Sequence, residues 1–175
     1  MIDELLTMRC QQGCRKSFDL LFRRWQRRLW RYARRLTGSD DAAWDVTQES
    51  WMAIVRRIRR LSDPSWFAAW AYRIVRNKCA DYARKASRQR SLTDAVAESN
   101  VPHEHVSRET PGDAVVQALR LMSPDKQELL TLRYALDLNL AEIAVVLSVP
   151  VGTVKSRLHN AREQLRRYCE ETNDE

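Results

Sequence analysis

The segment 139–158 constrains this chain more than any other, because it holds two short helical patterns separated by a proline. Asn139 is a favourable N-cap, and Glu142 follows three residues later, as in a capping box. Pro150 blocks continuation of the first helix, and Gly152 lies in the opening turn of the second. Two short helices joined by a tight turn, with basic residues on the second, form the layout of a helix-turn-helix.

The second helix of this motif separates an apolar stripe from a polar face. The stripe is expected to consist of Val154, Leu158, Ala161 and Leu165. The residues expected to face DNA are Thr153, Lys155, Ser156, Arg157, His159, Asn160 and Arg162. Lys and Arg read guanine or neutralise phosphate, and Asn pairs with adenine. The alternative is an ordinary amphipathic terminal helix.

The charge is distributed unevenly along the chain. The net charge is +7, but residues 1–90 carry 21 Lys and Arg against nine Asp and Glu, a local charge of +12. The local charge is −3 over residues 91–112 and −2 over residues 113–175. Twelve excess positive charges are more than solubility requires, so the first half is predicted to contact a polyanion.

Periodicity and composition predict an all-α fold. Only four Gly and five Pro are present, and apolar residues recur at helical spacing over most of the chain. In the first long helix this stripe is expected to consist of Phe18, Leu21, Phe22, Trp25, Leu29, Ala33 and Leu36. Helices are expected over about 14–36, 40–61, 64–85, 113–122, 124–136, 140–147 and 151–168, with a further helical turn or two within 1–12. Residues 91–112 have no sustained period. We therefore predict two small helical domains, 1–90 and 113–175, joined by a flexible linker over 91–112.

Two helices of the first domain carry candidate binding residues. Trp44, Gln48, Trp51 and Val55 form an apolar line distinct from the expected core stripe, which favours docking of a partner. The third helix interleaves aromatic, basic and amide side chains: Trp66, Tyr72, Arg73, Arg76, Asn77, Arg84 and Lys85. Rings stack on exposed bases while cations follow the backbone of a single strand. Phe67, Trp70 and Tyr82 are expected in the core, whereas Trp66 and Tyr72 are expected to be exposed.

Several classes of function are disfavoured. No stretch of about 18 apolar residues could insert into a membrane, and no signal peptide is evident, so a cytoplasmic protein is expected. No clustered carboxylates, Ser/His/Asp set or phosphate loop indicates an enzyme, a cofactor or a small-molecule substrate. Asp40, Asp41 and Asp45 are better explained by helix-start charge than by a metal site.

The four cysteines are expected to be reduced thiols. Cys10 and Cys14 are four residues apart, which suits one helical face better than a zinc knuckle. Zinc would need further ligands, of which His103 and His105 are the nearest in type, so no metal is predicted. A redox role for Cys10 and Cys14 stays open.

Three motifs in order resemble the group IV, or extracytoplasmic function (ECF), sigma factors of bacterial RNA polymerase. Segment 45–51, with Asp45, Gln48, Glu49 and Trp51, resembles region 2.2 of that family. Segment 67–84 resembles regions 2.3 and 2.4, and residues 139–162 resemble region 4.2. The likeness covers nearly the whole chain.

The resemblance implies a promoter-specificity factor without a catalytic site. It implies that Trp44, Asp45, Gln48, Glu49 and Trp51 bind the clamp helices of the core polymerase, and that residues 139–162 also dock its flap. It further implies that the third-helix residues named above recognise the −10 element and that the helix-turn-helix recognises the −35 element. A base of the −10 element is then expected to flip into a pocket near residues 87–91, in a loop after the third helix. An anti-sigma factor is an expected partner.

Some positions depart from the family's usual pattern. Asp137 and Ser148 stand where Gly is common, and Asp tolerates the left-handed turn. The pair His159 and Asn160 occupies a place where Arg is frequent, so the −35 preference of a relative should not be transferred. The remaining alternative is a free-standing helix-turn-helix regulator that binds an operator as a dimer without polymerase.

Overall fold

The computed structural model describes residues 2–93 and 114–173, and every regular element within them is a helix. The chain divides into two compact units, Met1–His105 and Val106–Glu175, called here the N-terminal and C-terminal units. Most of the predicted linker, residues 94–112, lies outside the described residues. Its first three residues belong to a helix instead.

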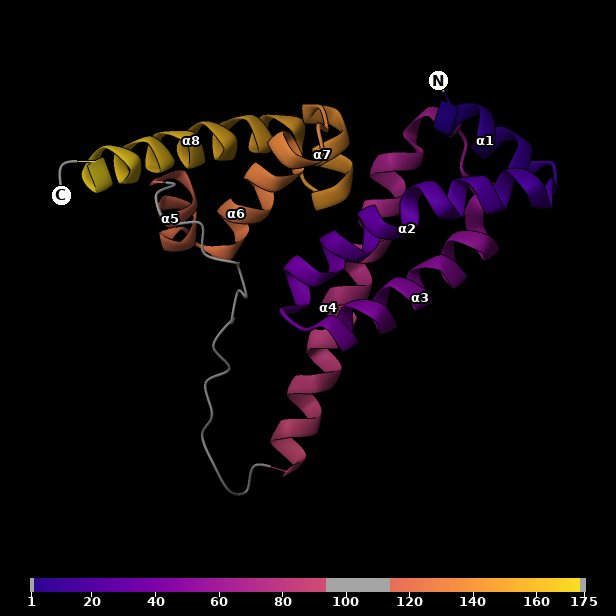
Figure 1. The fold of residues 1–175 in the computed structure, drawn as a ribbon, viewed down its shortest axis with the longest axis horizontal. Coiled ribbons are helices and arrows are strands. Elements are labelled where there is room, and N and C mark those ends of the chain that lie inside the picture. The colour runs from indigo at the N-terminus through magenta and orange to yellow at the C-terminus, as the bar shows by residue number, and fades with distance from the viewer. Residues whose placement is uncertain (1, 94–113, 174–175) are drawn as a thin grey trace. The chain divides into compact units, whose positions relative to one another are not determined.

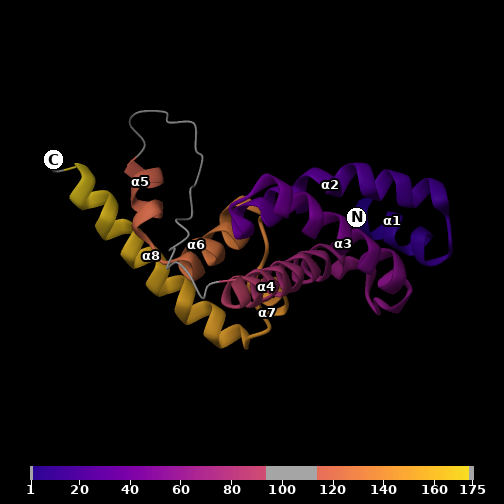
Figure 2. The same ribbon diagram turned by 90° about the horizontal axis from the view of Figure 1, so that it is seen from below.

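The N-terminal unit is a bundle of four α-helices: α1 (Ile2–Gln11), α2 (Arg15–Thr37), α3 (Asp40–Arg57) and α4 (Phe67–Thr93). Two short 3-10 helices, η1 (Ile58–Arg60) and η2 (Pro64–Trp66), connect α3 to α4. Helix α2 packs against α1, α3 and α4, which makes it the central element of the bundle (Figures 1 and 2).

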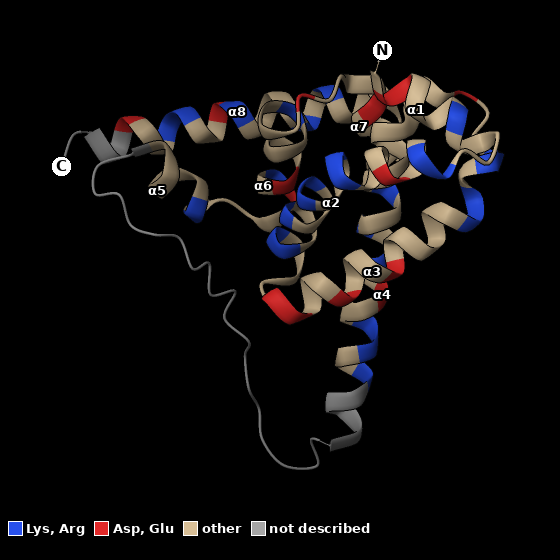
Figure 3. Cartoon of the chain, turned by 45° about the vertical axis from the view of Figure 1, so that its right-hand side comes forward, with Lys and Arg blue, Asp and Glu red and all other residues tan. Residues whose placement is uncertain are grey.

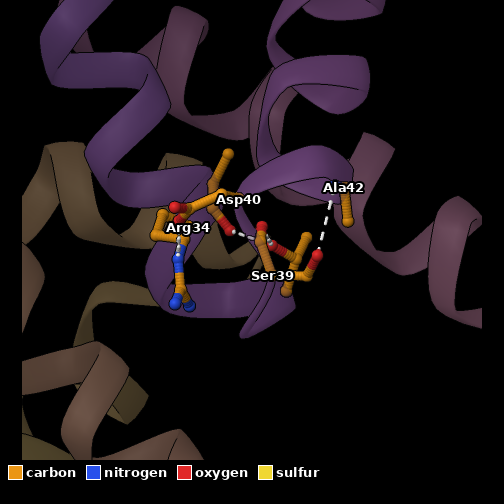
Figure 4. A network of polar contacts seen from close by, with 6 residues as sticks. Arg34, Ser39, Asp40 and Ala42 are labelled. Carbon is orange, nitrogen blue, oxygen red and sulfur yellow. Dashed lines mark hydrogen bonds and ion pairs between the residues drawn. The ribbon is translucent and has the colours of Figure 1, made fainter. Parts of the chain in front are cut away.

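The boundary between α2 and α3 follows from its capping residues. Gly38 adopts φ 73° and donates its N–H to the Arg34 carbonyl, which ends α2. Ser39 then caps α3 by accepting the Ala42 N–H (Figure 4). Arg34 forms an ion pair with Asp40, joining the basic end of α2 to the acidic start of α3.

Aromatic rings fill the centre of the N-terminal unit. Trp25 of α2 packs edge-on against Phe67 at 5.3 Å and against Tyr72 at 5.6 Å between ring centroids. Tyr32 contacts the same Tyr72 ring at 5.2 Å. The expected stripe of α2 is confirmed at Leu21, Trp25, Leu29 and Ala33, which are all buried.

Helix α1 is longer than the predicted turn or two, and polar contacts fix both of its ends. Asp3 pairs with Arg24 of α2 at 2.5 Å. The Gln11 amide donates to the carbonyls of Ile58 at 3.0 Å and Leu61 at 2.7 Å. Helix α1 is therefore attached to α2 at one end and to η1 at the other.

Three expectations for this unit were wrong. The second predicted helix ends at Arg57 rather than near Leu61, because the chain tightens into η1. Tyr82, expected in the core, is 40% exposed, because α4 extends beyond the helices that would cover it. Helix α4 also continues to Thr93, so residues 87–91 form no loop. Residues 86–93 contain neither Gly nor Pro, so the sequence there has no residue that would end a helix.

The C-terminal unit is built along one long helix. Helices α5 (Ala114–Leu121), α6 (Pro124–Leu130) and α7 (Leu140–Leu147) all contact α8 (Val151–Asn173). The predicted helix over 124–136 is interrupted, because residues Thr131–Ala135 form a π-helix, η3, closed by the Leu136 N–H to the Thr131 carbonyl at 3.0 Å. The core is aliphatic, with Leu132, Ile143, Val146, Val154 and Ala161 fully buried.

Candidate nucleic-acid interface

The turn between α7 and α8 is fixed by reciprocal capping. The Asn139 side chain accepts the Glu142 N–H at 2.9 Å, and the Glu142 carboxylate accepts the Asn139 N–H at 2.7 Å, which confirms the predicted capping box. Ser148 ends α7 in the left-handed conformation, with φ 57°. Asp137 also has a positive φ, of 54°. The helix-turn-helix backbone therefore forms with Asp and Ser at positions that favour glycine.

Helix α8 presents its predicted polar residues outward. Val154, Leu158 and Ala161 are buried, as expected, and Leu165 is half-buried. The exposed residues of the predicted set are Lys155, Ser156, Arg157, His159, Asn160 and Arg162, and Thr153 is half-buried. Lys155, His159 and Arg162 recur at spacings of four and three, so they share one side of the helix, while Thr153, Arg157 and Asn160 share the other.

The cations of this face are available to a ligand. In the described part of the chain, Lys155, Arg157 and Arg162 form no ion pair. Further along α8, Arg166 is instead placed between Glu163 at 3.4 Å and Glu170 at 3.6 Å. An uncompensated cationic face on the second helix of a helix-turn-helix is suited to phosphate and base contacts.

A second polar face runs along the outside of α4. Arg73 and Asn77 are exposed, and Trp66 and Trp70 before them are half-buried. Their spacings of four, three and four place them on one line that begins in η2. Arg84 and Lys85 are also exposed, and Arg84 pairs with Asp81 at 2.5 Å. Arg76 is half-buried. Figure 3 shows Lys and Arg along both α2 and α4.

Tyr72 does not belong to this face, which corrects the expectation that it is exposed. Its side chain is only 2% exposed and packs between Trp25 and Tyr32. Burial raises its pKa to about 12, although Arg28 acts in the opposite direction. Its ring is buried between α4 and two rings of α2, so Tyr72 contributes to the core. Phe67 is buried as expected, whereas Trp70 is only partly so.

A third candidate surface lies on α3. Trp44, Asp45 and Gln48 are exposed, and the ring centroids of Trp44 and Trp30 lie 5.5 Å apart. Trp51 is buried instead, because the rings of Phe18 and Phe22 pack against it. Their centroids lie 5.9 Å and 4.9 Å from the Trp51 ring centroid. The exposed line on α3 is therefore Trp44, Gln48, Met52 and Val55. Sequence reasoning missed Met52, although its spacing of four from Gln48 could have revealed it.

Glu49 links α3 to α4. Its carboxylate pairs with Lys78 at 2.9 Å, and the hydrogen bond from Lys78 holds the pKa of Glu49 below its usual value. The pair lies in a groove of about 490 Å³ whose lining includes Met52, Ala53 and Ile74. Arg56 and Arg57 line the same groove. Glu49 thus already has a partner on the neighbouring helix of the same unit.

The described residues contain no metal cluster and no membrane-spanning helix. Within 2–93 and 114–173, no three His, Cys, Asp or Glu residues come close enough to hold an ion. His103 and His105 lie outside that range. In the same residues, no helix is both long and apolar enough to cross a bilayer. Cys10 is buried and Cys14 exposed, and both are free thiols.

Two family models match the two units in order. The model described as Sigma-70 region 2 matches residues 21–89, and the model described as Sigma-70, region 4 matches residues 112–165. Two solved structures share the fold. The sigma factor RpoE of Bartonella quintana, in complex with the anti-sigma factor NepR, is 24% identical, with a TM-score of 0.70 and coverage of 89% of this chain and 98% of that one. CnrH, in complex with the cytosolic domain of CnrY, is 23% identical, with a TM-score of 0.67 and coverage of 97% of this chain and 98% of that one.

Relatives align over almost the full length of the chain. The ECF RNA polymerase sigma-E factor of Salmonella typhimurium is 30% identical over 94% of this chain and 93% of its own length. The RNA polymerase sigma-H factor of Pseudomonas aeruginosa is 29% identical over 93% of this chain and 91% of its own. These matches favour a polymerase factor over a free-standing operator-binding regulator. The chain belongs to the ECF sigma factors of the sigma-70 family, which bind RNA polymerase and direct it to promoters.

Proposed function

We propose that the two units contact different parts of the promoter. The C-terminal unit would hold the −35 duplex through the polar face of α8, formed by Thr153, Lys155, Ser156, Arg157, His159, Asn160 and Arg162. Exposure of this face, its unpaired cations and the capped turn before it support the assignment. The aliphatic stripe behind it keeps the helix in one orientation, as groove entry requires.

The N-terminal unit would bind core polymerase and open the −10 element. The α4 line of Trp66, Arg73 and Asn77, with Arg84 and Lys85 beyond it, suits a single strand, because rings stack on bases and cations follow phosphates. On α3, the exposed Trp44, Asp45 and Gln48 suit the clamp helices of the polymerase. Tyr72 and Trp51 support these surfaces from behind, because both are buried.

In this proposal the chain works in the cytoplasm with the polymerase and performs no chemistry of its own. The polymerase forms the phosphodiester bonds, and this chain selects where they begin. Its control by an anti-sigma factor is also proposed. The support is that one structural neighbour named above, RpoE of Bartonella quintana, is a sigma factor in complex with an anti-sigma factor, NepR.

The observation that carries the proposal is the exposed, uncompensated cationic face of α8. The test is transcription in vitro with bacterial core polymerase and pooled genomic promoter fragments, followed by sequencing of the transcripts. Discrete start sites that appear only with this protein are expected. If no new starts appear and the protein alone leaves a sharp footprint on DNA, it is an operator-binding regulator instead.

Lys155→Ala tests the −35 assignment. Loss of one direct contact is expected to weaken promoter binding by about 1 kcal/mol or more, while affinity for core stays unchanged. Arg167→Ala is the matched control, because Arg167 is exposed on the same helix beyond the proposed face. Equal losses of promoter and core affinity would contradict the role given to Lys155.

A further inference from the structure

A group of cations outside the surfaces described above gathers where α1 meets α2. Helix α1 ends in a left-handed turn at Gly13, with φ 87°. The Gly13 N–H bonds to the Cys10 carbonyl and the Cys14 N–H to the Arg9 carbonyl, each at 3.0 Å. This turn joins the end of α1, which carries Arg9, to the start of α2, which carries Arg15 and Lys16.

Arg59 joins this group from a distant part of the sequence. The two hydrogen bonds from Gln11 hold η1 against the end of α1. A methyl group built on Gly13 would lie 3.5 Å from Nη2 of Arg59, so the guanidinium lies over the turn. Arg9, Arg15, Lys16 and Arg59 are here called the turn cluster.

The turn cluster is exposed and uncompensated. All four side chains are exposed, and none forms an ion pair within residues 2–93 and 114–173. Arg24 and Arg34 of the same bundle, by contrast, each pair with an aspartate. Helix α2 also has no acidic residue in its first turn and no side-chain cap at its start, so its positive end adds to the local field.

Helix α1 connects the turn cluster to the start of the proposed reading face of α4. Helix η2 packs against α1, and it ends at Trp66, the first residue of the α4 line. Only five residues separate Trp66 from Arg60 at the end of η1. Helix α1 therefore joins the two surfaces, because it packs against η2 and carries the turn cluster at its C-terminal end (Figure 1).

Arginine and lysine without carboxylate partners, next to a surface suited to single-stranded DNA, match the charge of a phosphate backbone. We propose that the turn cluster binds phosphates of the promoter strand that continues past the α4 face. This inference rests on the proposed function and adds a second phosphate-binding surface to the N-terminal unit. Because phosphate contacts carry no sequence information, the surface would strengthen binding to every promoter alike.

The test uses holoenzyme assembled from the full chain and bacterial core polymerase. The variant combines Arg15→Gln, Lys16→Gln and Arg59→Gln, and the probe is a forked promoter fragment with a single-stranded non-template extension. Each phosphate contact to a single strand contributes about 0.7 to the slope of log affinity against log salt, so the slope is expected to fall by about 2. Affinity at physiological salt is expected to fall about tenfold.

A matched control changes the same net charge elsewhere. Arg23→Gln, Arg27→Gln and Arg31→Gln remove three exposed cations from the outer side of α2, away from the turn. The proposal is overturned if the control lowers the salt slope as much as the variant does, or if the variant leaves the slope unchanged. It is also overturned if the variant loses affinity for core instead, because the turn cluster would then face an acidic surface of the polymerase.

Two further measurements keep the result interpretable. Tryptophan fluorescence during urea unfolding is expected to show the same midpoint for the variant and the wild type, since all three side chains are exposed. Wild-type holoenzyme must also give promoter-specific starts. If it gives none, the proposed function fails. If it gives them and the slope is unchanged in the variant, only the turn-cluster inference fails.

Discussion

The two units reach a stable core with different side chains. In the N-terminal unit, rings meet across α2, α3 and α4: Trp25 with Phe67 and Tyr72, and Trp51 with Phe18 and Phe22. In the C-terminal unit the buried residues are mostly Leu, Ile, Val and Ala, and capping hydrogen bonds define the turns. All six tryptophans of the chain lie before residue 71.

This difference determines where a functional residue can be recognised. Aromatic side chains serve equally well as core and as base-stacking surface, so a ring within a motif of the N-terminal unit is ambiguous. In the C-terminal unit the core is aliphatic and the proposed site is polar, so residue type separates the two. The predictions below test this division.

The largest expected effect is at Tyr72. Tyr72→Ala removes a buried ring that contacts Trp25 and Tyr32, and it is expected to destabilise the N-terminal unit by about 3 kcal/mol or more. Tyr72→Phe keeps the ring and is expected to leave promoter opening unchanged. The measurement is urea unfolding followed by tryptophan fluorescence, which reports only on the N-terminal unit because the C-terminal unit has no tryptophan.

Promoter opening by Tyr72→Phe separates the two roles of this residue. If Tyr72→Phe opened promoters poorly while unfolding at the wild-type midpoint, the hydroxyl would act on DNA. The ring would then not be a core element alone, and the contrast between the two units would fail at this position.

Much of the fold could be predicted from the sequence. The i, i+4 spacing of Leu21, Trp25, Leu29 and Ala33 identified the buried side of α2, and Asn139 with Glu142 identified the start of α7. Both signals are local, because they depend on residues within one or two turns. The end of α4 was missed because tertiary packing does not stop that helix and the sequence contains no breaker.

Burial of particular rings could not be predicted from periodicity alone. Trp51 lies at the edge of the α3 core stripe, and its exposure depends on whether Phe18 and Phe22 of α2 cover it. That depends on how two helices approach each other, which one helix's pattern does not determine. The polar residues of α8 raised no such difficulty, because only one side of that helix is apolar.

The second expected effect concerns the caps of the C-terminal unit. Asn139→Ala removes the side chain that accepts the Glu142 N–H, and it is expected to destabilise this unit by about 1 kcal/mol. Ser123→Ala is the matched control, because Ser123 precedes α6 but makes no capping hydrogen bond with its side chain. Circular dichroism at 222 nm measures both units, and tryptophan fluorescence identifies the N-terminal contribution.

Equal effects from the two alanine variants would contradict this prediction. They would mean that the capping hydrogen bond adds nothing to the stability of the helix-turn-helix. The C-terminal unit would then depend on its aliphatic core alone, and the contrast in how the two units define their turns would disappear.

The smallest expected effect on stability comes from breaking the Glu49–Lys78 ion pair, which lies at the surface of the N-terminal unit. The side chains are 45% and 32% exposed, so solvent screening limits the contribution, and Glu49→Gln is expected to cost about 0.5 kcal/mol near neutral pH. Lys78 lowers the folded-state pKa of Glu49, so this stabilisation exists above the unfolded-state pKa and is lost as the pH falls through the folded-state value. The unfolding midpoints of variant and wild type should therefore converge as the pH falls through the lowered folded-state pKa of Glu49, with tryptophan fluorescence as the readout. A difference that persisted unchanged at low pH would show that Glu49 acts through packing rather than charge. A cost well above 1 kcal/mol would mean that ion pairs, as well as rings, hold α3 and α4 together.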